Sequence, residues 1–304
     1  MALTWVDLGA FVTFLAVVVG VSLYASRRER TSEDYFLAGR SLTWWLVGFS
    51  LIASNISTEH FVGMAGSAFG RVGMAIASYE WMAAVTLVIV AWFLLPKFLK
   101  AGIYTMPEFL EYRYNAGTRA IMATFLMVAY VVVALATVLY SGAIGLNAVF
   151  DLPGVLEERL GMDAEAAGFW ATVAGIWLIG LVAGAYTIYG GLKAVVWSDL
   201  IQGAGLLLGG ALVTVLGFKA LGAGEGLARG VEVFVEHNGH KLHTVLPWND
   251  PDVPWVAVFV GGLWIPNLFY WGLNQFITQR TLGARSLAEG QKGILLAACL
   301  KLSI

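Results

Sequence analysis

The feature that most constrains this chain is a set of long apolar stretches without charge. Five of them contain no Asp, Glu, Lys or Arg: 8–26, 120–150, 166–192, 200–218 and 253–279. About 20 apolar residues are enough for a helix to cross a bilayer. Only 12% of the 304 residues are charged, whereas a soluble domain carries about 25%. A soluble protein of this length has no core that could bury so many apolar helices. The sequence therefore predicts an all-α polytopic membrane protein.

We expect one transmembrane domain over residues 1–304. The first apolar stretch has no basic residues before it, so we interpret it as a helix and not as a signal peptide. The last stretch ends without a cap or an interfacial anchor, and we therefore expect the sequence to be a fragment. The predicted spans are 6–26, 42–69, 74–98, 120–149, 168–188, 193–218, 254–279 and 287–304.

The basic residues are distributed unevenly between the predicted loops. Twelve of the 18 lie in loops or near the ends of spans on one side of the membrane and five on the other, and Lys301 lies deep inside a span. Because Lys and Arg accumulate on the cytoplasmic face, this bias predicts a multi-pass protein of the cell membrane with its N-terminus outside.

Two of the predicted spans are interrupted by residues that disfavour a helix. The span 42–69 contains the polar segment 53–60, and the span 254–279 contains Gly261-Gly262 followed by Pro266-Asn267. If the first span is set aside, these two begin successive five-helix sets that cross the membrane in opposite directions. Interrupted helices at corresponding places of inverted halves mark the substrate and ion site of secondary transporters. Ordinary kinks in a helix bundle are the alternative.

Other classes of function find no support. The net charge of −2 does not suggest a nucleic-acid partner, and Cys299 is the only cysteine, which excludes an intrachain disulfide. There is no HExxH or GxSxG motif, so we expect neither an enzyme nor a cofactor.

Several motifs carry a more specific signal, and they occur in the expected order along nearly the whole chain. Together they resemble the solute:sodium symporter family, and most closely its bacterial sodium/galactose branch, which is related to the animal sodium/glucose cotransporters. These motifs are TSEDYFLAGRSL at 31–42, ASNIS at 53–57, ASYEWM at 77–82, YTMPEF at 104–109, IYGGLKAVVWSDLIQ at 188–202 and NQFITQRTL at 274–282.

The resemblance implies a LeuT-like core of two inverted five-helix repeats, with one extra N-terminal helix and a truncated second repeat. It also implies alternating access, sodium as the coupling ion, the lipid bilayer as surroundings, and a hexose such as galactose or glucose as cargo. A symporter for inositol or another organic solute is one alternative. A non-transporting sugar sensor on the same scaffold is another.

The resemblance further implies a set of sugar ligands: Asn55, His60, Glu80, Asn267 and Lys301. The sodium/galactose branch has Gln where this chain has His60, which leaves the preferred stereoisomer open. Glu80 is also a candidate on physical grounds, because an ionised group inside a span costs about 3 kcal/mol. Lys301 needs a counter-charge, and Glu80 is the candidate within the membrane. Glu80 as a purely structural partner of Lys301 is the alternative.

The remaining expected roles concern the ion and the gates. The backbone carbonyls of Ala53 and Ile56 would bind sodium, a hard cation that prefers oxygen ligands, and Asp199 would lie on the sodium path. The alternative for Asp199 is an interfacial residue that is stabilised only by the dipole of a nearby helix N-terminus. The resemblance makes Tyr270 an inner gate, and it makes Met64 and Tyr79 an outer gate. For all three gate residues, simple packing is the alternative.

Overall fold

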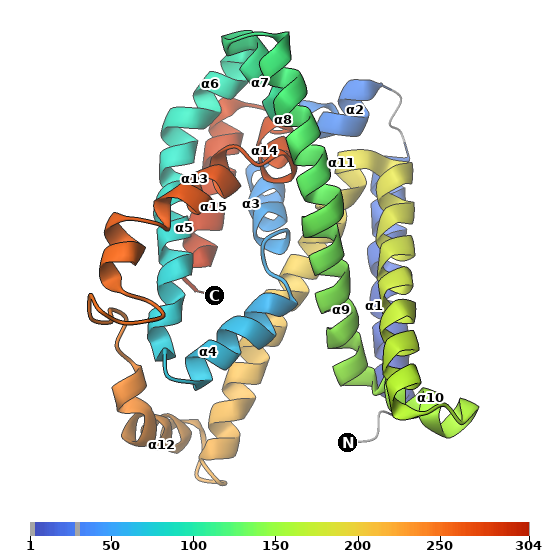
Figure 1. Cartoon of the computed structure of the whole chain (residues 1–304), viewed down its shortest axis with the longest axis vertical. Coiled ribbons are helices and arrows are strands. Elements are labelled where there is room, and N and C mark those ends of the chain that lie inside the picture. Colours follow the sequence, from blue (N-terminus) through green and yellow to red (C-terminus); the bar gives the residue numbers. More distant parts are fainter. Residues whose placement is uncertain (1–3, 28–30, 304) are drawn as a thin grey trace. The chain divides into compact units, whose positions relative to one another are not determined.

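A computed structural model describes residues 4–27 and 31–303, and these residues form helices with no strand beyond two isolated bridges (Figure 1). The chain divides into two compact units. The first comprises Met1–Arg40, Ser57–Glu59 and Ala101–Ser198, and the second comprises Ser41–Ile56, His60–Lys100 and Asp199–Ile304.

The first unit is built from long apolar helices and short polar ones. Polar caps fix several helix starts: the Thr4 hydroxyl accepts from the Asp7 amide at the start of α1, and Asn115 accepts from the Thr118 amide at the start of α8. Its helices are α1 (Trp5–Ser26), α2 (Ser32–Leu37), α7 (Met106–Arg113), α8 (Ala116–Val128), η5 (Ala129–Leu135), α9 (Ala136–Phe150), α10 (Leu152–Leu160) and the first part of α11 (Ala164–Leu221).

Helix α11 is interrupted at Gly191, which has φ 53° and ψ −152°. A Cβ atom there would lie 2.4 Å from the Tyr35 carbonyl oxygen, and the Tyr35 hydroxyl donates to the Ile188 carbonyl at 3.1 Å. Only glycine combines this backbone conformation with such a close approach. This non-helical residue lies between the predicted spans 168–188 and 193–218.

The second unit contains the second interrupted segment and most of the first, whereas Ser57–Glu59 belongs to the first unit. Within it α15 packs against α3 and α5, and α13 packs against α5 (Figure 1). Its helices are α3 (Trp44–Ala53), η2 (Glu59–Met64), α4 (Ala65–Phe69), η3 (Gly73–Ala77), α5 (Ser78–Ile89), η4 (Val90–Leu94), α6 (Leu95–Ala101), the rest of α11, α12 (Leu227–Asn238), η6 (Gly239–Lys241), η7 (Val256–Val260), α13 (Trp264–Gly272), α14 (Gln275–Leu282) and α15 (Leu287–Lys301).

Small residues and one buried carboxylate hold α3 against α15. A Cβ atom on Gly293 would come within 2.7 Å of the Val47 side chain, so the missing side chain allows the two helices to approach closely. At the start of α3, the Glu289 carboxylate accepts from the Trp44 amide at 2.7 Å and satisfies a donor that has no partner inside the helix. These contacts fix the position of α3 before its interruption.

Four helical segments are long and apolar enough to cross a membrane: Trp5–Ser26, Gly73–Ala101, Ala116–Phe150 and Ala164–Leu221. The shorter apolar helix α3 stops at Ala53 because the segment that follows is polar. Such helices indicate a multi-pass membrane protein.

Candidate functional site

The first interrupted helix is broken where the polar segment 53–60 begins. Helix α3 ends at Ala53, and the chain is helical again in η2, which begins at Glu59. The second interrupted helix stops at the end of η7, and its next helix, α13, begins at Trp264. The gap contains Gly261, whose φ of −116° and ψ of −113° lie outside the helical region. Both breaks expected at the polar segment and at the two glycines are present.

The break expected at Pro266 and Asn267 is absent, and that prediction was wrong. Pro266 lies in the first turn of α13, which begins at Trp264. The backbone amides of a first turn have no partner within the helix, so a proline there removes no hydrogen bond. The helix continues through Asn267, whose backbone amide donates to the Leu263 carbonyl at 3.2 Å.

A buried ion pair lies beside the first break. The Lys301 ammonium group donates to the Glu80 carboxylate and also to the side-chain oxygen of Asn55. Lys301 is 1% exposed and Glu80 is 7% exposed, so each charge depends on the other for its stability. The expectation that Glu80 provides the counter-charge of Lys301 is confirmed.

Two more side chains complete this cluster. The His60 Nε2 atom lies 3.4 Å from the other carboxylate oxygen of Glu80. The Lys301 ammonium group lies 5.6 Å from the centre of the Trp271 ring, within the range of a cation–π contact. We name Asn55, His60, Glu80, Trp271 and Lys301 the polar cluster. Charged donors and acceptors next to an aromatic surface are the groups that can bind a polyhydroxylated ring.

Sequence reasoning missed Trp271. Its only signal was an aromatic residue next to Tyr270, and tryptophans are frequent in this chain. Its ring is 2% exposed, which is unusual for so large a side chain. It lies on α13, which packs against α5, the helix that carries Glu80.

The expected sugar-ligand role of Asn267 and the expected gate roles of Tyr270 and Tyr79 stay predictions. The Asn267 side-chain amide donates to the Leu263 carbonyl at 2.9 Å, within its own helix. The Tyr270 ring makes edge contacts with Trp271 at 5.0 Å and with Phe276 at 5.8 Å. Tyr79, on α5, is 42% exposed. None of the hydrogen bonds found within residues 4–27 and 31–303 joins Asn267 to the polar cluster.

The two carbonyl groups expected to bind sodium lie at the start of the first break and inside it, and Met64 lies after it. Ala53 is the last residue of α3, where helix carbonyls lack intrahelical partners. The Ile52 carbonyl accepts from the amides of both Asn55 and Ile56. Ile56 is 7% exposed and lies in the unwound segment. Met64 is the last residue of η2 and is half-buried.

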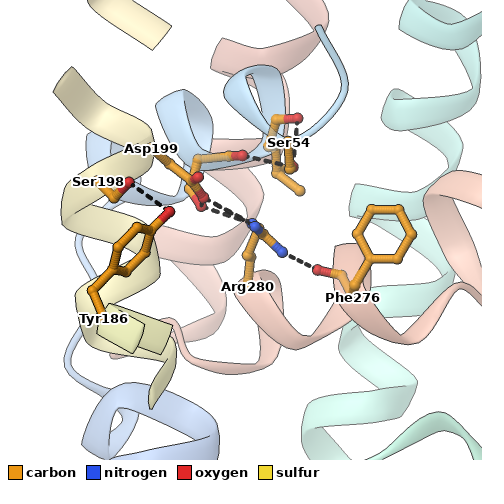
Figure 2. A network of polar contacts seen from close by, with 8 residues as sticks. Ser54, Tyr186, Ser198, Asp199, Phe276 and Arg280 are labelled. Atoms are coloured by element: carbon orange, nitrogen blue, oxygen red, sulfur yellow. Dashed lines mark hydrogen bonds and ion pairs between the residues drawn. The ribbon is translucent and has the colours of Figure 1, made fainter. Parts of the chain in front are cut away.

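A second buried network joins α3, α11 and α14 (Figure 2). The Arg280 guanidinium donates to the Asp199 carboxylate at 3.0 Å and to the Ser50 hydroxyl at 2.8 Å. Ser50 in turn donates to Asp199 at 2.5 Å. Figure 2 shows the guanidinium directed at Asp199 on one side and at the Phe276 backbone carbonyl, which accepts from it, on the other.

This network changes the interpretation of Asp199. Asp199 is 8% exposed and bound to a buried cation, so it is not an ordinary interfacial residue at a helix N-terminus. The partners of Asp199 could not be recognised from the sequence. Ser50 is one hydroxyl inside an apolar helix, and Arg280 follows an apolar stretch directly, where a basic residue is expected at the membrane surface.

A membrane-embedded helical chain with two interrupted helices and buried, paired charges next to a break has the features of a secondary transporter. Comparison with known proteins identifies its family. Residues 35–303 match the sequence profile of the Sodium:solute symporter family, and the chain belongs to that family. Members of this family are transporters and not enzymes.

The chain is 43% identical over 309 residues to a sodium/glucose cotransporter of Vibrio parahaemolyticus, covering 99% of this chain and 53% of that protein. It is 41% identical over 295 residues to the uncharacterized symporter YidK of Escherichia coli, covering 96% of this chain and 50% of that protein. The chain thus spans about half the length of these relatives.

A solved structure has the same fold. It is a sodium-coupled sialic acid symporter in a substrate-bound outward-open state, with a TM-score of 0.77 and 24% sequence identity. The match covers 99% of this chain and 58% of that one. The expected LeuT-like helical fold agrees with this similarity, whereas the truncation of the second repeat stays a prediction.

Proposed function

We propose that the protein transports a sugar together with sodium by alternating access, and that the cargo is a hexose such as galactose or glucose. The observation that carries the proposal is the buried bridge from Lys301 to Glu80 and Asn55, next to a helix break, in a member of a sodium-coupled symporter family. The name of the Vibrio parahaemolyticus relative supports glucose or a similar sugar as cargo.

In this proposal the polar cluster binds the sugar. Glu80 accepts from sugar hydroxyls, because each carboxylate oxygen has more lone pairs than its present partner uses. Asn55 and Lys301 donate to hydroxyl oxygens once the sugar replaces part of their mutual contact. His60 reaches the same carboxylate at 3.4 Å and is the residue that we expect to influence the choice between stereoisomers. Asn267 joins as a ligand after its side chain leaves Leu263.

Sodium would bind at the break itself. Ala53 ends α3 and Ile56 lies in the unwound segment, and carbonyls at such a break bind a cation without a charged side chain. We propose that Asp199 lies on the sodium path, with Arg280 as its resting partner. Tyr270 would close the pathway on the inner side, and Met64 and Tyr79 would close it on the outer side.

The proposal includes the arrangement in the membrane. The spans are those expected from the sequence, the N-terminus lies outside, and two inverted repeats follow the first helix. The bias of basic residues towards one set of loops supports this orientation. The opposite directions expected for the two interrupted spans support the inverted repeats.

Uptake of labelled galactose and glucose into proteoliposomes that contain the complete protein tests the function. A sodium gradient should drive uptake above the level seen with potassium, and Glu80→Ala should abolish it. Glu33→Ala is the matched control, because Glu33 is 44% exposed and lies outside the cluster, so it should leave uptake unchanged. Uptake indifferent to sodium contradicts symport.

The same assay separates the alternatives. Inhibition by inositol that is stronger than inhibition by either hexose indicates a carrier for inositol. Saturable hexose binding without any uptake indicates a sugar sensor on this scaffold.

A further inference from the structure

A segment outside the polar cluster connects the two interrupted helices. Residues 241–254, which we call the strap, follow α12 and lead into η7 (orange in Figure 1). The strap contacts the turn between α4 and η3, so it joins the segment after the first break to the segment before the second break. An isolated bridge between Leu246 and Pro254 orders the strap internally.

The beginning of the strap is fastened to the end of α4. The Lys241 ammonium group donates to the Phe69 carbonyl at 2.5 Å and lies 5.2 Å from the centre of the Phe69 ring. Phe69 is the last residue of α4, and its carbonyl is one of those that a helix leaves without an internal partner. Lys241 therefore caps this helix from a distant part of the sequence.

The backbone at the same place approaches closely. Gly73 has φ +60°, and a Cβ atom there would lie 2.4 Å from the Lys241 carbonyl oxygen. Both the dihedral angle and the contact require glycine. The strap and the first residue of η3 are therefore in direct backbone contact.

The end of the strap is fastened by charge. Arg71 donates two hydrogen bonds to the Asp250 carboxylate, at 2.7 Å and 3.1 Å, and one to Asp252. Asp250 also accepts from the backbone amides of Asp252 and Val253, each at 2.9 Å. The bond from Arg71, followed by these amide bonds, holds the pKa of Asp250 well below its ordinary value, so the pair stays ionised at neutral pH.

Apolar residues lie beneath these charges. Met82, Val253 and Val258 are buried together. Partly buried residues from the turn, the strap, η7, the second break and α13 pack around them: Val72, Leu246, Phe259, Leu263 and Trp264. This apolar cluster reaches Leu263 in the second break. The strap, the turn and the second break therefore share one set of packed apolar side chains.

We propose that the strap couples the two interrupted helices, so that η2 and α4 move together with η7, and that the pairing of Arg71 with Asp250 and Asp252 maintains this coupling. Without the pair, the two segments open independently of one another. The inference does not depend on the identity of the cargo or of the coupling ion.

Hydrogen–deuterium exchange of the complete protein in nanodiscs tests the coupling without sodium or sugar. In Arg71→Gln, which loses the exposed ion pairs with both Asp250 and Asp252, we expect exchange about fivefold faster in both 60–69 and 256–263. Arg71→Lys keeps the charge, so its exchange rates should lie between those of the unchanged protein and those of Arg71→Gln. Asp252→Asn, which leaves the Asp250 carboxylate and its amide bonds in place, serves as a second variant if Arg71→Gln does not fold.

The matched control is Arg229→Gln. Arg229 lies within hydrogen-bond or ion-pair distance of Glu225, Glu232 and Glu236, all on or next to α12, and is 42% exposed. The Arg229→Gln substitution should accelerate exchange only around α12. Acceleration in Arg71→Gln that is confined to the strap, with 60–69 unchanged, would overturn the proposal, whatever the protein transports. Equal acceleration of 60–69 in the control would also overturn it.

Discussion

Replacing Glu80 by Gln isolates the electrostatic part of the polar cluster. The substitution keeps the shape of the side chain and one hydrogen-bond acceptor, but it leaves the Lys301 charge, 1% exposed, without a counter-charge. Removing one partner of a buried ion pair costs about 3–5 kcal/mol. We expect the lower value, about 3 kcal/mol, because the bond to Asn55 and the Trp271 ring at 5.6 Å remain and continue to stabilise the cation.

This cost is large enough to measure as a change in thermal stability. About 1 kcal/mol corresponds to a shift of roughly 2–4 °C for a chain of a few hundred residues, so Glu80→Gln should melt about 6–12 °C below the unchanged protein. The assay follows intrinsic fluorescence of the protein in nanodiscs, without sugar. The double variant Glu80→Gln with Lys301→Met removes both charges and should recover most of the loss, because a buried pair replaced by neutral groups of similar size is often neutral in stability.

A matched control distinguishes burial from charge. The exposed pair between Arg40 and Glu33 has a distance of 2.9 Å, with exposed fractions of 27% and 44%. Glu33→Gln should change stability by less than about 1 kcal/mol, because water screens such a pair. If Glu80→Gln has the same melting temperature as this control, the two charges are not coupled and the reasoning fails. The same follows if the double variant is less stable than Glu80→Gln alone.

Three further outcomes are expected. Arg280→Gln should destabilise the protein by about 3 kcal/mol, because Asp199 is left buried without its cation, and Asp199→Asn in the same chain should restore part of the melting temperature. His60→Ala should weaken hexose binding about tenfold in a competition assay through the loss of one hydrogen bond, whereas His60→Gln should retain affinity and change the preference between epimers. Because Arg71 lowers the pKa of Asp250, the ionised carboxylate stabilises the strap above the ordinary pKa of 3.8, and this contribution is lost as the pH falls towards the folded-state pKa. Exchange in the strap, corrected for intrinsic rates, should therefore be unchanged between about pH 7 and pH 5 and accelerate below about pH 4, and Asp250→Asn should reduce that acceleration.

Helix interruptions were predictable where the residues themselves disfavour a helix. The polar segment 53–60 and the pair Gly261-Gly262 break their helices because side chains or the missing Cβ act locally. Pro266 misled the prediction, since the effect of a proline depends on its position in the helix. That position was set by where α13 begins, which local sequence does not determine.

Long-range partners were predictable only where physical necessity left one candidate. An intramembrane lysine needs a carboxylate, and Glu80 was the available one, so the pair could be expected across the whole chain. Ser50, Arg280 and Trp271 could not be recognised in this way. Each has an ordinary explanation in its local sequence, and only the packing of α3, α13 and α14 makes it a partner of a buried charge.

The most direct test of the central claim is the dependence of hexose affinity on sodium. The dissociation constant of a labelled hexose is measured on the complete protein in nanodiscs, with sodium replaced by potassium at constant ionic strength. We predict that the affinity falls without sodium, that hexose raises sodium affinity by the same factor, as linkage requires, and that Glu80→Ala loses hexose binding at every sodium concentration. Equal hexose affinity in sodium and potassium, or undiminished affinity in Glu80→Ala, would contradict a sodium-coupled sugar site at the polar cluster.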